Sequence, residues 1–323
     1  MIKVQKLSKH FGKVKAVDEI SFEVKEHENL ILLGTSGCGK TTTLKMINRL
    51  IEPSAGNILI DGKNISEQSP ETLRRGIGYV LQNNGLFPHY TVAENIAIVP
   101  QLLKWDKKRT EKRTAELLEK LHLTKDYLNV YPNELSGGQQ QRIGLARALV
   151  ADPAVLLMDE PFGALDNVTR SKIHAEFKAL DELKRKTIIM VTHDVQEAFE
   201  LGDHICLMDQ GKIVQDGTPA DLLFNPKNNF VKEFLQEQRL QLEFKTIKLN
   251  QVLRLLKGEA KKGVGQVTNI SADVSFWSAL EHYKFDGVDE LKIIDKENNG
   301  TWTANFEELM AAFYQYKKQQ AHE

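Results

Sequence analysis

Apolar and polar residues alternate along the start of the chain. Apolar side chains recur with period two in residues 2–7 and again in residues 20–24, on either side of Gly12. Strict alternation is typical of strands that bury one face, and glycine favours a turn between them. The pattern therefore predicts an antiparallel hairpin or a small antiparallel sheet at the start of the chain.

Three runs of consecutive apolar residues follow, at positions 30–33, 155–158 and 188–191, the last of them preceded by Thr187. Short continuous runs of this kind are typical of strands that are buried on both faces, as in a parallel sheet. Residues 57–60 and 78–81 predict two further short strands.

Helical spacing is found between these runs. Leu44, Ile47 and Leu50 fall on one face of the helix expected after the first run, and residues 92–123 predict a long helical region. Ser136 is a good N-cap for a helix that continues to residue 150. Strands that alternate with helices in this way indicate an α/β fold.

The pattern weakens after residue 238. Residues 239–268 lack strong periodicity and carry several lysines and glycines, so we expect a linker there. Residues 269–323 follow the order helix, strand, strand, helix, and Asn305 and Glu308 match a capping box for the last helix. We therefore expect a main domain at 1–238, a linker, and a small α+β piece at the end.

Composition adds limits to this picture. The 323 residues are 41% hydrophobic and 27% charged, which is ordinary for a globular protein and long enough for two domains. A net charge of −1 gives no basic field for nucleic acid. No apolar run approaches the roughly 20 residues that span a bilayer, and the first residues lack the apolar segment of a signal peptide. Cys38 and Cys206 have no metal-ligand spacing. We expect a cytoplasmic, non-integral protein with reduced cysteines.

The first apolar run leads into the pattern of a phosphate-binding loop, Gly34-x-x-x-x-Gly39-Lys40-Thr41. Gly34, Gly37 and Gly39 permit positive φ angles and close backbone approach to a triphosphate. Lys40 is expected to reach the β and γ oxygens, and the Thr41 hydroxyl to bind Mg²⁺. The alternative is a glycine-rich turn without a ligand, but the flanking strand and helix favour a nucleotide site.

Charged residues end the other two apolar runs. Asp159 and Glu160 follow the second run, where adjacent carboxylates are costly unless they are paired or bind a metal. Asp159 is expected to hold Mg²⁺ and Glu160 to polarise an attacking water. His193 follows the third run, at the strand end where nucleotides bind in parallel sheets. Phe11 stacks on adenine or belongs to the core; the sequence leaves both open.

Two surface features have alternative interpretations. Residues 83–90 contain an apolar knuckle at 86–88, which is either a packed loop or a docking surface for a partner. Residues 104–113 form a basic run around Trp105, which is either a solvated helix face or a region close to anionic lipid headgroups.

Taken in order, these motifs resemble the ATP-binding cassette of ABC transporters over about residues 1–238. The resemblance is carried by the P-loop, Gln82, the Leu-Ser-Gly-Gly-Gln signature at 135–139, the strand and acids at 155–161, Asp166 and His193. It implies a P-loop NTPase with a mostly parallel core sheet, an antiparallel β subdomain and a helical signature subdomain. The order of elements at 269–323 resembles a single cystathionine-β-synthase (CBS) repeat.

The resemblance implies site residues and a homodimer. Catalysis is assigned to Glu160, His193 and Gln82, and Mg²⁺ to Thr41, Gln82 and Asp159. Two chains pair head to tail, so that the signature of one chain caps the ATP bound to the other. Nucleotide binding is assigned to Phe11, Gly34, Ser36, Gly37, Cys38, Gly39, Lys40, Thr41, Thr42, Ser136, Gly137, Gly138, Gln139 and Asp166.

A closer similarity is visible to importers of osmoprotectants. Residues 45–50, 85–89, 94–100 and 159–166, together with Trp105, are similar to that family, which takes up glycine betaine, carnitine and choline. The similarity implies permease subunits, an extracytoplasmic substrate-binding protein and a peripheral location at the cytoplasmic face of the cell membrane.

Other functions remain open on the sequence. The alternatives are an importer of another small solute such as an amino acid, a non-transport ABC ATPase, and a catalytically dead regulator. The last is disfavoured because Lys40, Glu160 and His193 are all present. The CBS-like piece either pairs with its copy in a second chain, is vestigial, or only stabilises the cassette dimer.

Overall fold

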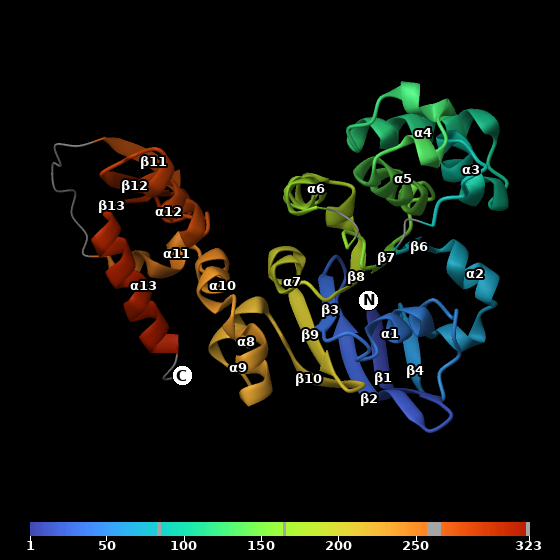
Figure 1. The fold of residues 1–323 in the computed structure, drawn as a ribbon, viewed down its shortest axis with the longest axis horizontal. Coiled ribbons are helices and arrows are strands. Elements are labelled where there is room, and N and C mark those ends of the chain that lie inside the picture. The colour runs from blue at the N-terminus through green and yellow to red at the C-terminus, as the bar shows by residue number, and fades with distance from the viewer. Residues whose placement is uncertain (83–84, 164–165, 257–265, 321–323) are drawn as a thin grey trace. The chain divides into compact units, whose positions relative to one another are not determined.

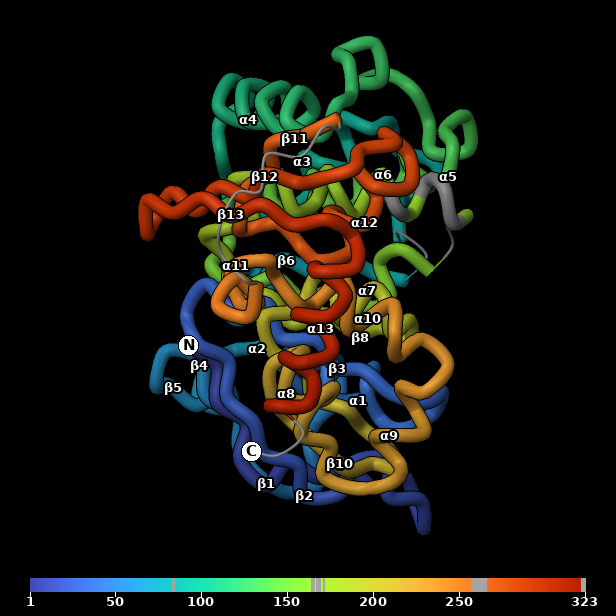
Figure 2. The backbone as a smooth tube through the Cα atoms, turned by 90° about the vertical axis from the view of Figure 1, so that its left-hand side faces the viewer, coloured from blue at the N-terminus to red at the C-terminus, as the bar shows by residue number. Residues whose placement is uncertain are grey.

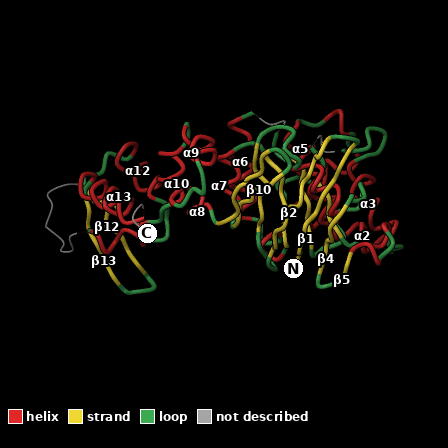
Figure 3. The backbone as a smooth tube through the Cα atoms, turned by 90° about the horizontal axis from the view of Figure 1, so that it is seen from below, coloured by secondary structure: helices red, strands yellow, loops and turns green. Residues whose placement is uncertain are grey.

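Two units make up the chain, Met1–Asp216 and Gly217–Glu323, which we call unit 1 and unit 2. The computed structural model describes residues 1–82, 85–163, 166–256 and 266–320 (Figure 1). Figure 3 shows that strands and helices are present in both units.

A six-stranded sheet lies at the centre of unit 1. Its strand order is β10-β9-β3-β8-β7-β6, and the pairs from β9 to β6 are parallel. All residues of β7 and β8 are buried, which confirms the interpretation of the apolar runs. The strands are β3 (Asn29–Gly34), β6 (Ile77–Val80), β7 (Val155–Asp159), β8 (Thr187–Thr192), β9 (His204–Asp209) and β10 (Lys212–Gly217).

Parallel pairing brings the carboxyl ends of the central strands to one edge of this sheet. Gly34 ends β3, Asp159 ends β7 and Thr192 ends β8. The residues that follow each strand therefore meet at this edge, which is where parallel sheets bind ligands.

The predicted hairpin is confirmed as part of a second, antiparallel sheet with the order β2-β1-β4-β5. The turn after β1 uses Gly12 with φ of +59°. At Gly56 a Cβ atom would lie 2.3 Å from the carbonyl oxygen of Lys6, so only glycine fits there. The strands are β1 (Ile2–Phe11), β2 (Val14–Val24), β4 (Ala55–Ile60) and β5 (Lys63–Asn64).

The described residues of unit 1 form seven α-helices besides the sheets. Helices α3, α4 and α5 gather at the end of the unit that lies away from the β1–β2 hairpin (Figures 1 and 2). The helices are α1 (Lys40–Ile47), α2 (Pro70–Arg75), α3 (Val92–Leu102), α4 (Lys107–Lys120), α5 (Gly137–Leu149), α6 (Asn167–Ala179) and α7 (Val195–Leu201). Short 3-10 turns are η1 (Ile65–Glu67), η2 (Lys125–Asn129), η3 (Pro132–Glu134) and η4 (Leu183–Arg185).

Two helix predictions in unit 1 need correction. The apolar face expected to include Leu50 is wrong, because α1 ends at Ile47 and Arg49 turns the chain with φ of +48°. Leu50 is 47% exposed. The helical region 92–123 is two helices, because the Asp106 side chain accepts a hydrogen bond from the Arg109 amide and begins α4 as its N-cap.

Unit 2 contains a three-stranded sheet with the order β11-β12-β13, in which the first pair is parallel and the second antiparallel. The capping box is confirmed: Asn305 and Glu308 exchange two hydrogen bonds at the start of α13. The elements are α8 (Pro219–Phe224), α9 (Asn229–Gln236), α10 (Arg239–Thr246), α11 (Leu249–Val252), η5 (Leu253–Leu255), β11 (Val267–Ser271), α12 (Phe276–Phe285), β12 (Glu290–Asp295), β13 (Gly300–Ala304) and α13 (Phe306–Gln320).

The structure differs from the expected linker at 239–268. Helices α10 and α11 occupy most of its first half, and the core of unit 2 includes Phe244, whose ring lies 5.4 Å from that of Phe276 and 4.6 Å from that of Phe313. Helices this short carry too few turns for their period to be visible in the sequence. The division of the chain also falls at 216/217 instead of 238. Residues 257–265 lie outside the described residues.

No helix among the described residues combines the length and the apolar character that crossing a bilayer requires.

Candidate nucleotide site

The loop between β3 and α1 requires glycine at the positions that the sequence singled out. Gly34, Gly37 and Gly39 have φ angles of +151°, +79° and +104°. A Cβ atom on Gly34 would lie 2.1 Å from the Met208 carbonyl oxygen, and one on Gly39 would lie 2.3 Å from that of Ala16. The loop is thus closely packed from behind. Its backbone conformation is available only to residues without a side chain.

Lys40 lies in the first turn of α1 and is 5% exposed. Its ammonium donates to the carbonyl oxygens of Gly34 at 2.7 Å and Thr35 at 2.8 Å, so the side chain curls over the loop. The Cys38 sulfur lies 3.7 Å from the same ammonium. Burial raises the pKa of the Cys38 thiol, and the charge of Lys40 opposes this only in part. The positive charge of Lys40 is therefore held at the mouth of the loop.

Thr41 and Asp159 meet across the edge of the sheet. The Thr41 hydroxyl donates to Asp159 Oδ1 at 2.8 Å. Asp159 is only 4% exposed, and burial raises the pKa of its carboxyl above the ordinary value. A buried carboxylate beside a hydroxyl is an oxygen donor set that suits Mg²⁺, whose charge would offset the cost of burying Asp159. These two residues fit a magnesium ion.

Glu160 is the centre of a second group of polar side chains. Its Oε2 atom accepts a hydrogen bond from Gln82 Nε2 at 2.9 Å and lies 3.2 Å from His193 Nδ1. Its backbone amide donates to the Val191 carbonyl oxygen at 3.0 Å. The structure thus brings together three residues from the ends of β6, β7 and β8. Gln82 contacts Glu160, and no hydrogen bond joins it to Thr41 or Asp159 within the described residues.

Glu160 also has an unusual backbone conformation, with φ of +45°. A residue other than glycine in this region costs on the order of 1–3 kcal/mol, and such strain is concentrated at functional sites. The conformation turns the chain sharply after β7 and leaves the Glu160 side chain partly accessible, with 18% exposure.

The signature residues form the N-terminus of α5. Ser136 is the N-cap, and the Gln139 side chain accepts from the Ser136 amide at 2.8 Å, which completes a capping box. Gln139 Nε2 donates to the Tyr127 hydroxyl at 2.8 Å. The first amides of a helix, here those of Gly137 and Gly138, have no intrahelical acceptor and attract anions. Among the described residues, no hydrogen bond or ion pair joins this turn to the P-loop of the same chain.

Phe11 is 50% exposed at the end of β1, so the core alternative for this ring is wrong. The Lys9 ammonium lies 5.1 Å from its centroid. Asp166 is exposed, and its carbonyl oxygen accepts from the Arg170 amide at 2.8 Å where α6 begins. The two residues before it, 164 and 165, lie outside the described residues. Ser36 and Thr42 lie in the loop and in α1, in the sequence positions expected for them.

Asn95 is a structural residue that the sequence analysis missed. It is fully buried in α3 and accepts from the Phe87 amide at 2.8 Å. Its amide nitrogen lies 3.0–3.1 Å from the carbonyl oxygens of Phe87, Tyr90 and Thr91. Asn95 therefore fixes the knuckle and the residues just after it. Phe87 on the knuckle is 43% exposed, and Tyr90 after it is 40% exposed. A polar residue on the apolar face of the predicted helix was the available signal.

His174 in α6 was also missed. It is 4% exposed and lies between Glu197 and Glu200 of α7, at 3.1 and 3.3 Å. Burial lowers the pKa of His174, but hydrogen bonds to both glutamates outweigh this and raise the pKa to about 9. The Phe162 ring packs edge-on against it at 4.8 Å. His174 thus connects α6, α7 and the segment that follows Glu160, which no sequence spacing indicates.

A profile of the family described as "ABC transporter" matches residues 17–163. The glycine betaine/carnitine/choline transport ATP-binding protein OpuCA of Bacillus subtilis is 48% identical to this chain over 299 residues, which span 92% of this chain and 76% of the relative. The chain belongs to the ABC transporter family of ATP-binding proteins.

Other ABC relatives agree. The glycine betaine uptake system ATP-binding protein YehX of Escherichia coli is 42% identical over 310 residues, covering 96% of this chain and 99% of the relative. A solved structure of the ATP-binding cassette MJ0796, a dimer in a post-hydrolysis state with ADP and phosphate, covers 68% of this chain and 98% of its own, with a TM-score of 0.61 and 34% identity. These ABC proteins confirm the P-loop fold predicted for unit 1.

Proposed function

We propose that this chain is the ATP-hydrolysing subunit that powers import of quaternary-amine osmoprotectants, such as glycine betaine, carnitine and choline. As a member of the ABC family it is an ATPase. The substrate class rests on relatives at 42–52% identity, whose names specify glycine betaine, carnitine, choline or osmoprotectant transport. The observation that carries the catalytic part is the meeting of Gln82, Glu160 and His193 at the ends of three parallel strands.

Glu160 is proposed as the general base that takes a proton from the attacking water. Its carboxylate is close to two groups that can hold it and the water in place, Gln82 and His193. Lys40 exchanges its carbonyl partners for phosphate oxygens when ATP binds, because a phosphate is the stronger acceptor. Thr41, Asp159 and Gln82 are proposed to hold Mg²⁺, which neutralises charge on the phosphates when bound.

The signature turn is proposed to act on ATP held by a second copy of the chain. Support comes from the capped N-terminus of α5, which has no hydrogen bond to its own P-loop among the described residues, and from a dimeric structural neighbour. Gly137 and Gly138 would offer backbone amides to the γ-phosphate, and Ser136 its hydroxyl. Phe11 would stack on adenine.

The transporter is proposed to place this chain at the cytoplasmic face of the membrane. The exposed Phe87 on the knuckle and Tyr90 just after it supply an apolar contact for a permease subunit, and Asn95 keeps them in position. An extracytoplasmic binding protein would deliver the solute to that permease.

Unit 2 is proposed to contain a single CBS-like repeat. Its support is the order β11-α12-β12-β13-α13 with a parallel and an antiparallel pairing. A role in tuning transport to ionic strength is tested by ending the chain at Asp216, which spares the core of unit 1. An unchanged salt response of uptake would contradict that role.

The deciding experiment measures ATP-dependent uptake of labelled glycine betaine, carnitine and choline into proteoliposomes. These hold the chain together with its permease and binding protein, with wild type compared against Glu160→Gln. Uptake that is lost in the variant supports both the ATPase role and the substrate class. ATP turnover without uptake of any of the three solutes would retain the ATPase and favour another solute, such as an amino acid.

A further inference from the structure

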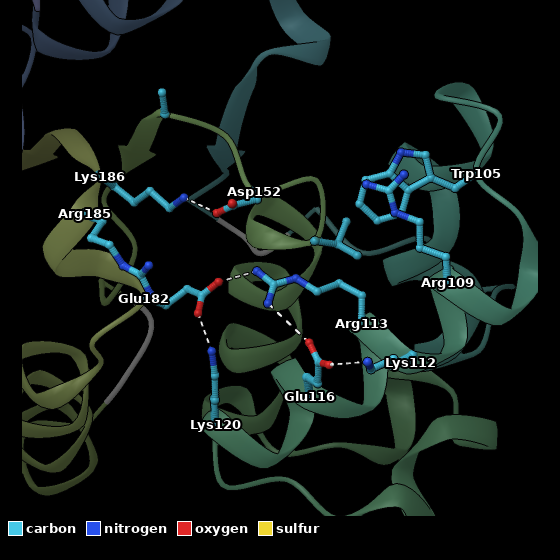
Figure 4. A pocket seen from close by; sticks show the side chains of 12 residues that line it. Trp105, Arg109, Lys112, Arg113, Glu116, Lys120, Asp152, Glu182, Arg185 and Lys186 are labelled. Atoms are coloured by element: carbon cyan, nitrogen blue, oxygen red, sulfur yellow. Dashed lines mark hydrogen bonds and ion pairs between the residues drawn. The ribbon is translucent and has the colours of Figure 1, made fainter.

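A cavity of about 630 Å³ lies in unit 1, apart from the nucleotide site (Figure 4). It lies between α4, the connection that leads into β7, and η4. None of the residues assigned above to ATP, Mg²⁺ or catalysis lines it.

The lining of this cavity is strongly cationic. Three acidic residues, Glu116, Asp152 and Glu182, face six basic ones, a net excess of three positive charges (6 − 3). Ion pairs with the three acids offset part of this charge, and the excess that is left favours an anion. The basic residues are Arg109, Lys112, Arg113, Lys120, Arg185 and Lys186.

One buried acid, Glu182, and one buried lysine, Lys186, order part of this lining. The Glu182 side chain is 7% exposed and forms ion pairs with Arg113 and Lys120. Burial raises the pKa of the Glu182 carboxyl, but its hydrogen bonds with Arg113 and Lys120 outweigh this and lower the pKa to about 2. Lys186, whose side chain is 7% exposed, pairs with Asp152. The Glu182 pairs join α4 to the segment around η4, and the Lys186–Asp152 pair joins that segment to the connection that leads into β7.

Two arginines at the cavity, Arg109 and Arg185, form no ion pair within 4 Å among the described residues, although the charge of Arg185 acts on the nearby Asp181. The Arg109 guanidinium lies over the Trp105 ring, with its Cζ atom 3.6 Å from the ring centroid (Figure 4). Stacking fixes the guanidinium plane while the N–H donors at its edge stay available for an oxyanion. Arg185 comes from η4, on the side of the cavity that Lys186 and Glu182 also occupy (Figure 4).

We propose that this cavity binds a small anion that carries one or more phosphate groups, with Arg109 of α4 on one side of the cavity and Arg185 of η4 on the other (Figure 4). Planar guanidinium groups match phosphate oxygens with paired hydrogen bonds, which a lysine cannot do. The phosphate belongs either to a soluble compound or to the headgroup of an anionic lipid. In both cases the anion is bound at a site separate from the ATP site.

The test measures two probes against the full chain at low ionic strength. Inorganic pyrophosphate is titrated calorimetrically, and vesicles of phosphatidylglycerol are compared with vesicles of phosphatidylcholine by sedimentation. The cavity variant is Arg109→Gln with Arg185→Gln. The matched control is Lys108→Gln with Lys184→Gln, which removes the same charge from neighbouring positions outside the lining. Each protein is also made with Lys40→Ala, so that pyrophosphate at the P-loop is not counted.

We expect the cavity variant to bind one of the two probes with an affinity about tenfold or more below that of the wild type, because paired hydrogen bonds to charged groups are lost. The control pair should change the affinity for that probe by less than about twofold, since exposed charges contribute little to binding. Loss of pyrophosphate binding identifies a soluble ligand, and loss of phosphatidylglycerol binding identifies a lipid headgroup. Equal effects of both pairs, or no binding of either probe to the wild type, would overturn the proposal.

Discussion

Glu160 combines several properties that a catalytic carboxylate needs. It is the residue after a fully buried strand, it lies within 3.2 Å of His193 and 2.9 Å of Gln82, and its backbone is strained. Asp159, its neighbour, is instead buried and bonded to Thr41. Adjacent acids in different surroundings can take different roles, one at a metal and one at a water molecule.

The substitution Glu160→Gln separates these roles. We expect ATP binding to be unchanged and hydrolysis to fall by ~10²-fold or more, because a general base is lost while the shape of the side chain is kept. Nucleotide affinity and steady-state phosphate release measure the two effects. Near-normal turnover in this variant would show that another group takes the proton.

At Asn95 the expected effect is on stability and coupling. Asn95→Ala removes the bonds that fix the knuckle and leaves buried polar groups without partners, so the free energy of unfolding should fall by about 1–3 kcal/mol. Uptake should fall more than basal ATP hydrolysis, because Asn95 also holds Phe87 and Tyr90, the proposed contact with the permease. The control is Gln101→Ala, an exposed change in the same helix. An equal loss of stability and uptake in the control would contradict the role of Asn95 in holding the knuckle.

At the scale of elements, the sequence predicted what strong local patterns determine. The apolar runs became β3, β7 and β8, and the alternating start became the β1–β2 hairpin. These patterns are reliable because a strand buried on one or both faces restricts every side chain along it. The nucleotide loop was predictable for a similar reason, since its glycines satisfy backbone requirements that no other residue meets.

Elements that depend on distant contacts were not predictable. Helix α10 packs Phe244 against rings that are 32 and 69 residues further along the chain (276 − 244 and 313 − 244), and its own sequence is too short to show a period. The pairing of His174 with α7 likewise depends on two helices meeting in space. The Gln82–Glu160 contact joins positions that only the sheet order brings together.

His174 predicts a pH dependence for the packing of α6 against α7. Its pKa rises from 6.5 to about 9 on folding, so its stabilising contribution is complete below 6.5 and is lost as the pH rises through about 9. We expect the difference in the free energy of unfolding between wild type and His174→Gln to be largest near pH 6.5 and to shrink as the pH rises toward 9. Urea unfolding of both proteins across the window measures it, and a constant difference would mean that His174 is neutral in the folded chain.

At the scale of the whole molecule, the two units have separate hydrophobic cores. Glu243 is a buried charge in unit 2, with no exposed surface, and it pairs with Arg239 at 2.9 Å and Lys317 at 2.6 Å. It therefore ties α10 to α13, the last helix of the chain. Removing one partner of a buried ionic group is strongly destabilising, because the remaining charges lose their compensation.

We expect Glu243→Gln to lower the free energy of unfolding of unit 2 by about 3 kcal/mol. ATP hydrolysis by unit 1 should change little, because none of the proposed catalytic residues lies beyond His193. Calorimetric unfolding and phosphate release test the two statements. Glu233→Gln, an exposed change in α9, serves as the control; a comparable destabilisation there would mean that the buried ion pairs are not the cause.

The strained backbone of Glu160 means that the residue needed for activity also lowers the stability of the folded chain. Glycine adopts a positive φ without cost, so Glu160→Gly relieves strain in the chain while it removes the carboxylate. A population of genes selected only for heat resistance or expression level would therefore accumulate inactive alleles at this codon. Laboratory evolution of this chain therefore needs a growth screen that depends on transport. Without it, selection for stability favours variants that no longer hydrolyse ATP.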